Sequence, residues 1–337
     1  MVRKLKSWLK KYRVGITLLL VIVAVIVCLG MFAGPKKSNH VVSVNVASGA
    51  SVSAVANNLK KRGVIDSVSS FKIAVQANGG RIQAGIYDIP RGASAWRIAT
   101  MLANGDVAKT TIVIPEGLTI KQIKQLLSDS VELNGSVNCD SGNNAPVCNL
   151  HDGDVFPDTY RVARGTSRLA VLDLARKKMV DVHNDFENKI RRMPSPLKNW
   201  NDVLTLASIV QKETPRVKEM PIVASVYLNR LNSGMRLQAD PTVVYALTNG
   251  LGDMQGAPLL SGHLHIDSPY NTYRNSGLPP APIANVGRDA IYAVLNPART
   301  KFLFFVADGH GGHNFAKTYE EHVKNHEAWR KIKKSRK

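Results

Sequence analysis

The chain has 337 residues and a formal net charge of +20, with 45 lysines and arginines against 25 aspartates and glutamates. It is too long for one typical domain, so we expect two or three compact units. The positive charge favours an anionic partner surface, such as nucleic acid, phospholipid headgroups or an acidic cell-wall polymer.

A basic N-terminal segment precedes a long uncharged one. Residues 1–13 hold six lysines and arginines, whereas residues 14–33 carry no charge and are mostly aliphatic. Twenty helical residues span about 30 Å, the thickness of a bilayer core. Because the apolar region of a cleaved signal peptide is usually only about 7–15 residues long, we predict an uncleaved transmembrane helix over residues 14–33, after a cytoplasmic basic segment over residues 1–13.

The basic residues also predict the orientation of this helix. Only Lys36 and Lys37 follow it closely, so the N-terminus is expected in the cytoplasm. The chain would then be a single-pass protein of the cell inner (cytoplasmic) membrane, with everything after about Gly34 in the periplasm or at the cell exterior. Such a location argues against a nucleic-acid partner. The basic C-terminal tail, residues 326–337, is expected to be a solvated, frayed helix end.

A short pattern then occurs three times, starting at Gly49, Gly92 and Gly117. A hydroxyl residue follows each glycine at +2, a β-branched residue at +6 and leucine at +10. This is typical of a strand end, a turn and a short helix capped by the hydroxyl group. With strands expected at residues 41–46, 83–89 and 110–114, residues 41–130 form a small α+β region.

This region resembles the LysM module, which binds N-acetylglucosamine polymers. Tyr87 and Trp96 are candidates to stack on sugars, although each is equally suited to a core. Residues 131–150 are expected to form a loop that contains Cys139 and Cys148. In an oxidising compartment this pair is able to form a disulfide, and the sequence leaves both states open.

The rest of the chain combines helical periodicity with a short strand. Helical spacing is present over residues 168–179, 202–213 and 221–231, while residues 301–306 have the aromatic and β-branched composition of a central strand. The order predicts an α+β catalytic domain over residues 150–325. The predicted fold class is therefore α+β, with an N-terminal transmembrane helix, a small LysM-like α+β subdomain and a C-terminal α+β catalytic domain.

One carboxylate falls on the apolar face of a predicted helix. Leu206, Ile209, Val210 and Glu213 are spaced i, i+3, i+4 and i+7. A carboxylate against an apolar wall has a raised pKa, which a proton donor near neutral pH requires. We therefore predict that Glu213 is catalytic. The alternative is that this helix end points to solvent or pairs with an arginine nearby in sequence, Arg216, Arg230 or Arg236.

Polar motifs follow Glu213 along the chain. Asp240-Pro241 is a typical helix start, so we predict that Asp240 caps a helix and does not act in acid/base chemistry. Residues 268–273 carry amide, hydroxyl and phenol groups suited to sugar hydroxyls. Residues 277–280 (Gly-Leu-Pro-Pro) predict a rigid turn, and residues 308–315 a turn whose glycines let the backbone approach a ligand.

Seven segments, in order, resemble the MltG (YceG-like) endolytic murein transglycosylase family: residues 153–160, 206–214, 224–231, 235–242, 270–273, 277–280 and 305–315. The resemblance covers nearly the whole chain. It implies an inner-membrane enzyme that cuts glycan strands internally, between N-acetylmuramic acid and N-acetylglucosamine, and so terminates strand elongation. Its catalytic glutamate falls on Glu213. Two departures are Gln211, where many relatives carry an acidic residue, and the loop with the two cysteines.

Such an enzyme is able to work with one carboxylate. Glu213 would donate a proton to the glycosidic oxygen and then take the proton of the muramyl C6 hydroxyl, which attacks the anomeric carbon and leaves a 1,6-anhydro end. We expect no cofactor and no metal. The expected partners are peptidoglycan glycan strands, with peptidoglycan synthases as further candidates. The candidate substrate-binding residues are Tyr270, Asn271, Tyr273, Asn229, Arg236, Gln238, Asp240 and Asn314.

Three alternatives remain open at this point. One is a hydrolytic muramidase in which Asp240 or Glu219 is the second carboxylate. Another is a non-catalytic, membrane-anchored scaffold that binds peptidoglycan. The third is metal-dependent hydrolysis with histidine ligands drawn from His263, His265, His310 and His313.

Overall fold

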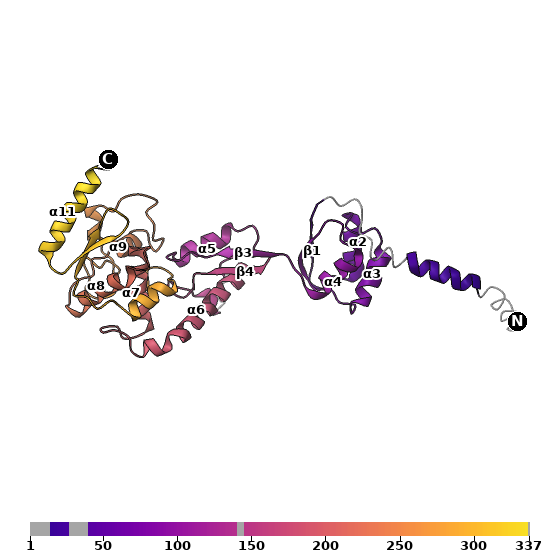
Figure 1. Ribbon diagram of the computed structural model, residues 1–337, viewed down its shortest axis with the longest axis horizontal. Coiled ribbons are helices and arrows are strands. Elements are labelled where there is room, and N and C mark those ends of the chain that lie inside the picture. Colours follow the sequence, from indigo (N-terminus) through magenta and orange to yellow (C-terminus); the bar gives the residue numbers. More distant parts are fainter. Residues whose placement is uncertain (1–13, 27–39, 140–144, 336–337) are drawn as a thin grey trace. The chain divides into compact units, whose positions relative to one another are not determined.

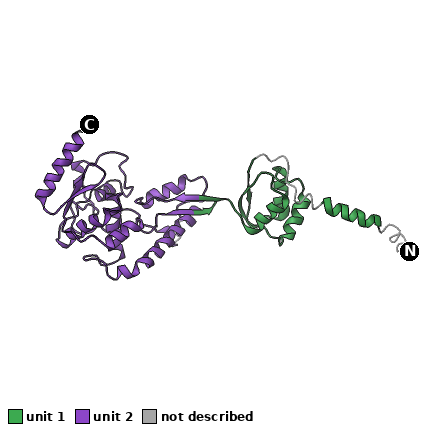
Figure 2. Cartoon of the chain, viewed as in Figure 1, with its two compact units in different colours: residues 1–110, 161–165 green, residues 111–160, 166–337 purple. Residues whose placement is uncertain are grey.

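The computed structural model describes residues 14–26, 40–139 and 145–335, and its elements are labelled in Figure 1. Two units are distinguished, residues 1–110 with 161–165 and residues 111–160 with 166–337 (Figure 2). Residues 111–130, which the sequence analysis grouped with the LysM-like region, belong to the second unit. Helices and small two-stranded sheets make up the structure, which confirms the predicted mixed α+β class.

Residues 14–26 form a helix with mostly exposed side chains. They are the described part of the predicted transmembrane helix. Residues 27–33 and the basic segment 1–13 lie outside the described residues. In the part of the chain that the structure describes, no helix has both the length and the apolar character needed to cross a bilayer.

The first unit is built on an antiparallel strand pair. Strands β1 (Val42–Val46) and β2 (Gly85–Ile89) flank helices α2 (Val52–Lys61) and α3 (Val68–Ala77), and α4 (Ala95–Asn104) packs against α3. Ser51 and Ser94 cap α2 and α4 by accepting hydrogen bonds from backbone amides at 3.1 and 3.2 Å, which confirms the predicted caps. Helix α3, capped by Ser67, lies between two copies of the repeat and was not predicted.

Tyr87 belongs to the core of this unit. Its side chain is 0% exposed, and its hydroxyl donates to the backbone oxygen of Gln83 at 2.8 Å. Stacking of this ring on a sugar is therefore ruled out, because strand β2 turns it inward. Trp96 is half-buried and packs against the same core.

The second unit begins with a strand and a capped helix. Strand β3 (Lys109–Val113) pairs with β4 (Thr159–Ala163), and both strands pass through the division between the units. Helix α5 (Ile120–Asp129) starts with a capping box between Thr119 and Gln122, as the third copy of the repeat predicted. Strand β4 was not predicted.

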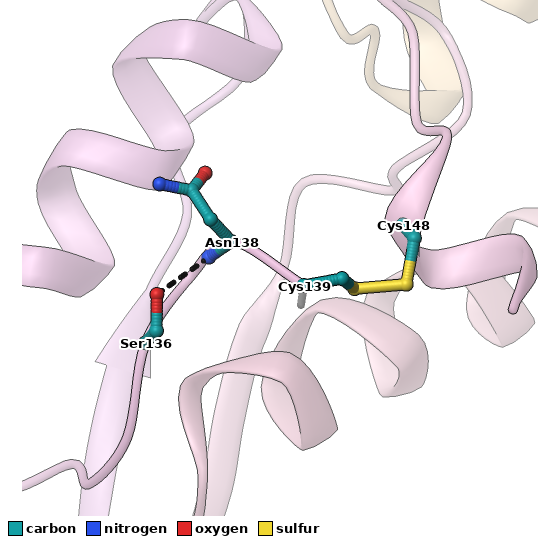
Figure 3. Close-up of a disulfide and its surroundings, with 4 residues drawn as sticks. All are labelled: Ser136, Asn138, Cys139 and Cys148. Atoms are coloured by element: carbon teal, nitrogen blue, oxygen red, sulfur yellow. Dashed lines mark hydrogen bonds between the residues drawn. A yellow bond between two sulfur atoms is a disulfide. The ribbon is translucent and has the colours of Figure 1, made fainter. Parts of the chain in front are cut away.

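Cys139 and Cys148 are joined by a disulfide, with their Cα atoms 5.6 Å apart (Figure 3). Cys148 ends the short helix η1 (Pro146–Cys148), and Ser136 accepts a hydrogen bond from the amide of Asn138 at 2.9 Å just before the other cysteine. The bond closes the loop expected over residues 131–150 and answers the question that the sequence left open.

Five helices form the main core of the second unit: α6 (Arg168–Ile190), α7 (Trp200–Glu213), α8 (Met220–Asn232), α9 (Asp240–Leu247) and α10 (Arg288–Leu295). Helix α10 packs against both α7 and α8. The three helices expected from periodicity are confirmed, although α6 extends well beyond residue 179. A short helix, η2 (Ser261–His265), precedes the polar residues 268–273.

The C-terminal elements differ from the prediction. Strands β5 (Phe304–Ala307) and β6 (His313–Ala316) form an antiparallel hairpin, and helix α11 (Tyr319–Ser335) packs against both strands. The expected central strand over residues 301–306 is wrong, because among the described residues β5 has one partner strand, and its side chains are only half-buried. Its aromatic residues contact helices, not two neighbouring strands. Residues 326–335 of the basic tail are part of α11, which begins at Tyr319.

Asn285 fixes the position of residues 153–160, the first of the seven segments that resemble the family. Its side chain is 0% exposed, accepts from the amides of Gly153 (3.0 Å) and Val155 (3.1 Å), and donates to the backbone oxygen of Leu118 (3.0 Å). Gly153 has φ +92°, and a Cβ there would lie 2.9 Å from Pro282. This segment therefore ties three parts of the second unit together and is structural.

Candidate active site

Glu213 is the last residue of α7, and it lines a pocket of about 270 Å³. Leu206, Ile209 and Val210 are all fully buried, so the apolar stripe faces the core as predicted, and Glu213 at its end is half-buried. The pocket is lined by side chains from four helices, one hairpin and two loops, namely Glu213, Tyr227, Arg230, Gln238, Asp240, Tyr273, Phe304, Phe305, Tyr319 and His322.

A hydrogen bond from Tyr227 holds the Glu213 carboxylate. The hydroxyl of Tyr227, on α8, donates to Oε1 at 2.6 Å, and the Tyr227 ring is fixed in turn by an edge-on contact with Phe305 (5.8 Å between centroids). Since a phenol gives its proton up only well above neutral pH, this bond leaves Oε2 as the oxygen available to carry an acidic proton.

The surroundings of Glu213 shift its pKa strongly. Desolvation raises the pKa to about 7 in spite of the hydrogen bond from Tyr227, which lowers it. The charge of Asp240 raises the pKa further, and that of Arg230 lowers it. Glu213 is therefore close to half protonated at neutral pH, as a general acid needs to be.

None of the three nearby arginines forms an ion pair with Glu213 in the structure. Arg230 is 7% exposed and donates to the backbone oxygens of Leu303 and Leu237, each at 2.6 Å. Arg216 pairs with Glu219 at 3.6 Å, and Arg236 donates to the backbone oxygen of Tyr273 at 3.2 Å. Arg230 and Arg236 hold loops in place, and the alternative in which Glu213 pairs with one of the three arginines is not found in the described part of the chain.

Asp240 has a different role from the predicted one. Ala239 is the N-cap of α9, Asp240 is the first helical residue, and it makes no capping hydrogen bond, so the predicted cap is wrong. The helix begins one residue earlier than expected, which turns the carboxylate toward the pocket. There its Oδ1 accepts from the Tyr273 hydroxyl at 2.6 Å.

The structure thus brings Gln238, Asp240 and Tyr273 together with Glu213. Gln238 has a left-handed backbone, with φ +50°, and its amide donates to the backbone oxygen of Thr272 at 3.1 Å. A non-glycine residue in this conformation is uncommon and is often found at functional sites.

The other five candidates lie elsewhere. Asn271 is fully buried and donates to the backbone oxygens of Leu264 and Ile266, while Asn229 donates to those of Thr300 and Phe302. These two asparagines and Arg236 hold loops in place. Tyr270 lines a second pocket, where its ring lies 4.8 Å from that of Tyr245, and Asn314 is exposed on β6.

Sequence reasoning missed Tyr227 and the residues from the C-terminal hairpin and helix. Tyr227 lies within the family-like segment 224–231, fourteen positions after Glu213, but its position on a buried helix face is equally typical of a core tyrosine. Phe304 and Phe305 reach the pocket because β5 packs against α8, and Tyr319 and His322 reach it because α11 folds back on the hairpin. No local pattern signals such a contact.

The structure also places the residues of two alternatives, the second carboxylate of a muramidase and the histidine ligands of a metal site. Glu219 is bonded to His313 (2.8 Å) and lies outside the Glu213 pocket, so Asp240 is the second carboxylate among the described lining residues. Within the described ranges, no three His, Cys, Asp or Glu side chains are grouped as metal ligands, and the four histidines considered above are not brought together in that way.

Comparison with known proteins finds YceG-like proteins and endolytic murein transglycosylases. The family model described as "YceG-like family" matches residues 44–328. The endolytic murein transglycosylase of Bacillus subtilis (strain 168) is 32% identical over 318 residues, which cover 87% of this chain and 86% of that protein. The protein of the same name from Streptococcus pneumoniae (serotype 2, strain D39) is 26% identical over 326 residues, which cover 86% of this chain but 58% of that protein. A crystal structure of a yceG-like protein from Listeria monocytogenes is 29% identical, with a TM-score of 0.52 over 85% of this chain and 99% of that chain.

Proposed function

The chain belongs to the YceG-like family, and on this premise we propose that it is an endolytic murein transglycosylase. Its reaction would cut the bond between N-acetylmuramic acid and N-acetylglucosamine within a glycan strand. The observation that carries the proposal is Glu213, a carboxylic acid with a pKa near neutrality in a pocket of about 270 Å³. Two relatives that cover most of this chain bear that name.

The reaction proceeds in two proton transfers at one residue. Protonated Glu213 gives its proton to the glycosidic oxygen as the bond to the anomeric carbon breaks. The muramyl C6 hydroxyl attacks that carbon, and its proton goes to the Glu213 carboxylate. The products are a strand with a 1,6-anhydro end and a strand with a free C4 hydroxyl, so no water is consumed and the glutamate is ready for another cycle. Because the nucleophile is part of the substrate, positioning replaces a second catalytic carboxylate.

Asp240 supports the same step electrostatically. Its carboxylate is exposed and accepts from Tyr273. A negative charge in the pocket raises the pKa of Glu213 and stabilises the positive charge that develops on the sugar ring in the transition state. Tyr227 and Tyr273 thus orient the two carboxylates, one as acid and one as anion.

The product mass tests this proposal. Sacculi digested with the wild-type chain should release muropeptides with anhydro ends, which are one water, or about 18 Da, lighter than hydrolysed reducing ends. Reducing ends would favour the muramidase alternative, with Asp240 activating water. Binding to sacculi without any muropeptide release would favour a scaffold.

We also propose that the chain is anchored in the cell inner membrane with its N-terminus in the cytoplasm. The uncharged residues 14–33, helical over 14–26, support the anchor. The Cys139–Cys148 disulfide supports a location outside the cytoplasm, because such bonds persist in oxidising compartments. The full chain should stay in the membrane pellet after alkaline extraction, whereas a chain without residues 1–33 should be soluble. A full chain that is extracted would contradict the anchor.

Two finer proposals concern partners. The arrangement β1–α2–α3–β2, with its antiparallel strand pair, supports a LysM-like role in holding glycan. Removing residues 41–110 should then weaken the pull-down by sacculi.

An anchored strand-cutting enzyme would also meet peptidoglycan synthases at the same membrane, and cross-linking in intact cells tests that contact.

A further inference from the structure

Helix α11 contributes a titratable side chain to the Glu213 pocket that the mechanism above does not use. His322 lines the pocket together with Tyr319, one turn earlier on the same helix. Its ring stacks on Phe304 at 5.3 Å and an interplanar angle of 23°. Phe304 is in turn contacted by the guanidinium of Arg230 at 5.4 Å. His322 is therefore held in a fixed orientation beside residues of the candidate active site.

The two ring nitrogens of His322 have different environments. Nδ1 is buried and has no hydrogen-bond partner. Nε2 also makes no hydrogen bond within the described residues, but it keeps some exposure to solvent. An orphaned buried N–H donor is costlier than an orphaned lone pair. The proton of a neutral ring is therefore on Nε2, the nitrogen that remains accessible.

The ring is also neutral at physiological pH. Burial lowers the pKa of His322 below its usual value because a charged ring is disfavoured away from water, and His326 and Arg230 lower it further by repelling a positive charge. His322 accordingly presents an uncharged N–H donor. Three other donors of the pocket already bond to protein acceptors, since Tyr227 donates to Glu213, Tyr273 to Asp240 and Arg230 to two backbone oxygens.

We propose that His322 is a substrate-binding residue whose Nε2–H donates to the carbonyl oxygen of an acetamido group on the bound glycan. This inference rests on the proposed function, which supplies sugars that carry such groups. An amide carbonyl is a strong neutral acceptor and suits a neutral donor. The aromatic side chains of Phe304, Phe305 and Tyr319 line the same pocket and provide an apolar surface for the acetamido methyl group. Helix α11 thereby completes the pocket.

The test compares two histidines on one helix. His322→Phe removes the donor but keeps a ring that stacks on Phe304, and His326→Phe makes the same change one turn further on, outside the pocket. We expect His322→Phe to raise KM for N-acetylated strands about tenfold, the effect of losing one neutral hydrogen bond, with kcat changed much less. His322→Gln, whose amide keeps a donor, should recover part of the loss. His326→Phe and His326→Gln should match the wild type, and thermal melting should confirm that all four variants fold.

The chemical partner is tested by changing the substrate. With strands whose sugars have been de-N-acetylated, the difference between the wild type and His322→Phe should largely disappear. A difference that persists on such strands, or a His322→Phe variant with the KM of His326→Phe, would overturn the inference.

A binding experiment separates this inference from the proposed function. In a Glu213→Gln background, which should bind strands but cut them far more slowly, His322→Phe should weaken the affinity for N-acetylated glycan about tenfold. If the wild-type chain neither binds nor cuts glycan, the proposed function fails. If it does both and the His322→Phe change leaves the affinity unaltered, only the contact proposed here is wrong.

Discussion

The Glu213→Gln variant should cut glycan strands about 10²- to 10⁴-fold more slowly than the wild-type chain, because it lacks the general acid. Glutamine has nearly the same shape, and its carbonyl oxygen is still able to accept the hydrogen bond that Tyr227 donates to Oε1. The substitution therefore removes the acidic proton while leaving the packing at the end of α7 in place. The rate of release of anhydro-muropeptides from sacculi measures the effect.

Glu219→Gln is a matched control for this variant. Glu219 lies six positions further along the chain, also carries a half-buried carboxylate, and is bonded to His313 outside the pocket. We expect it to retain most of the wild-type rate. Thermal melting of both variants separates a loss of chemistry from a loss of folding. Comparable rates for Glu213→Gln and the wild type would contradict the assignment of Glu213.

The features that could be predicted from sequence are those with a local cause. The spacing of Leu206, Ile209 and Val210 fixes the buried face of α7, and Glu213 follows on that face whatever the rest of the chain does. In the same way, Ser51 bonds to an amide only three residues away, so its cap is readable from one short segment. Such patterns predict structure correctly because the residues that interact lie close together in the sequence.

The features that were missed depend on contacts between distant segments. Asp240 was expected to cap α9, but its partner Tyr273 comes from a loop 33 residues later, and a shift of one residue in the helix start decides which contact forms. The aromatic residues of β5 favoured a central strand in the sequence analysis. Aromatic composition indicates that a strand is buried, but it does not indicate whether a strand or a helix covers it. Their neighbouring helices are α8 and α11, and α11 also brings His322 to the pocket. No periodicity within either segment contains that information.

Cleavage should also lose activity as the pH rises through about 7, the pKa of Glu213. Only the protonated form donates to the glycosidic oxygen, so kcat/KM should fall about tenfold for each pH unit above that value. The pH profile of kcat/KM on soluble glycan strands measures this pKa in the free enzyme. A rate that stays constant to pH 9 would be inconsistent with Glu213 as the proton donor.

Two variants should move this inflection in opposite directions. Asp240→Asn removes a negative charge that disfavours the Glu213 anion, so the pKa of Glu213 should fall and the loss of activity should begin at lower pH. Tyr227→Phe removes a hydrogen bond that favours the same anion, so that pKa should rise and activity should persist to higher pH. A non-specific disturbance of the pocket would shift both profiles the same way. Opposite shifts would therefore identify Glu213 as the titrating group, with Asp240 and Tyr227 as the residues that set its pKa.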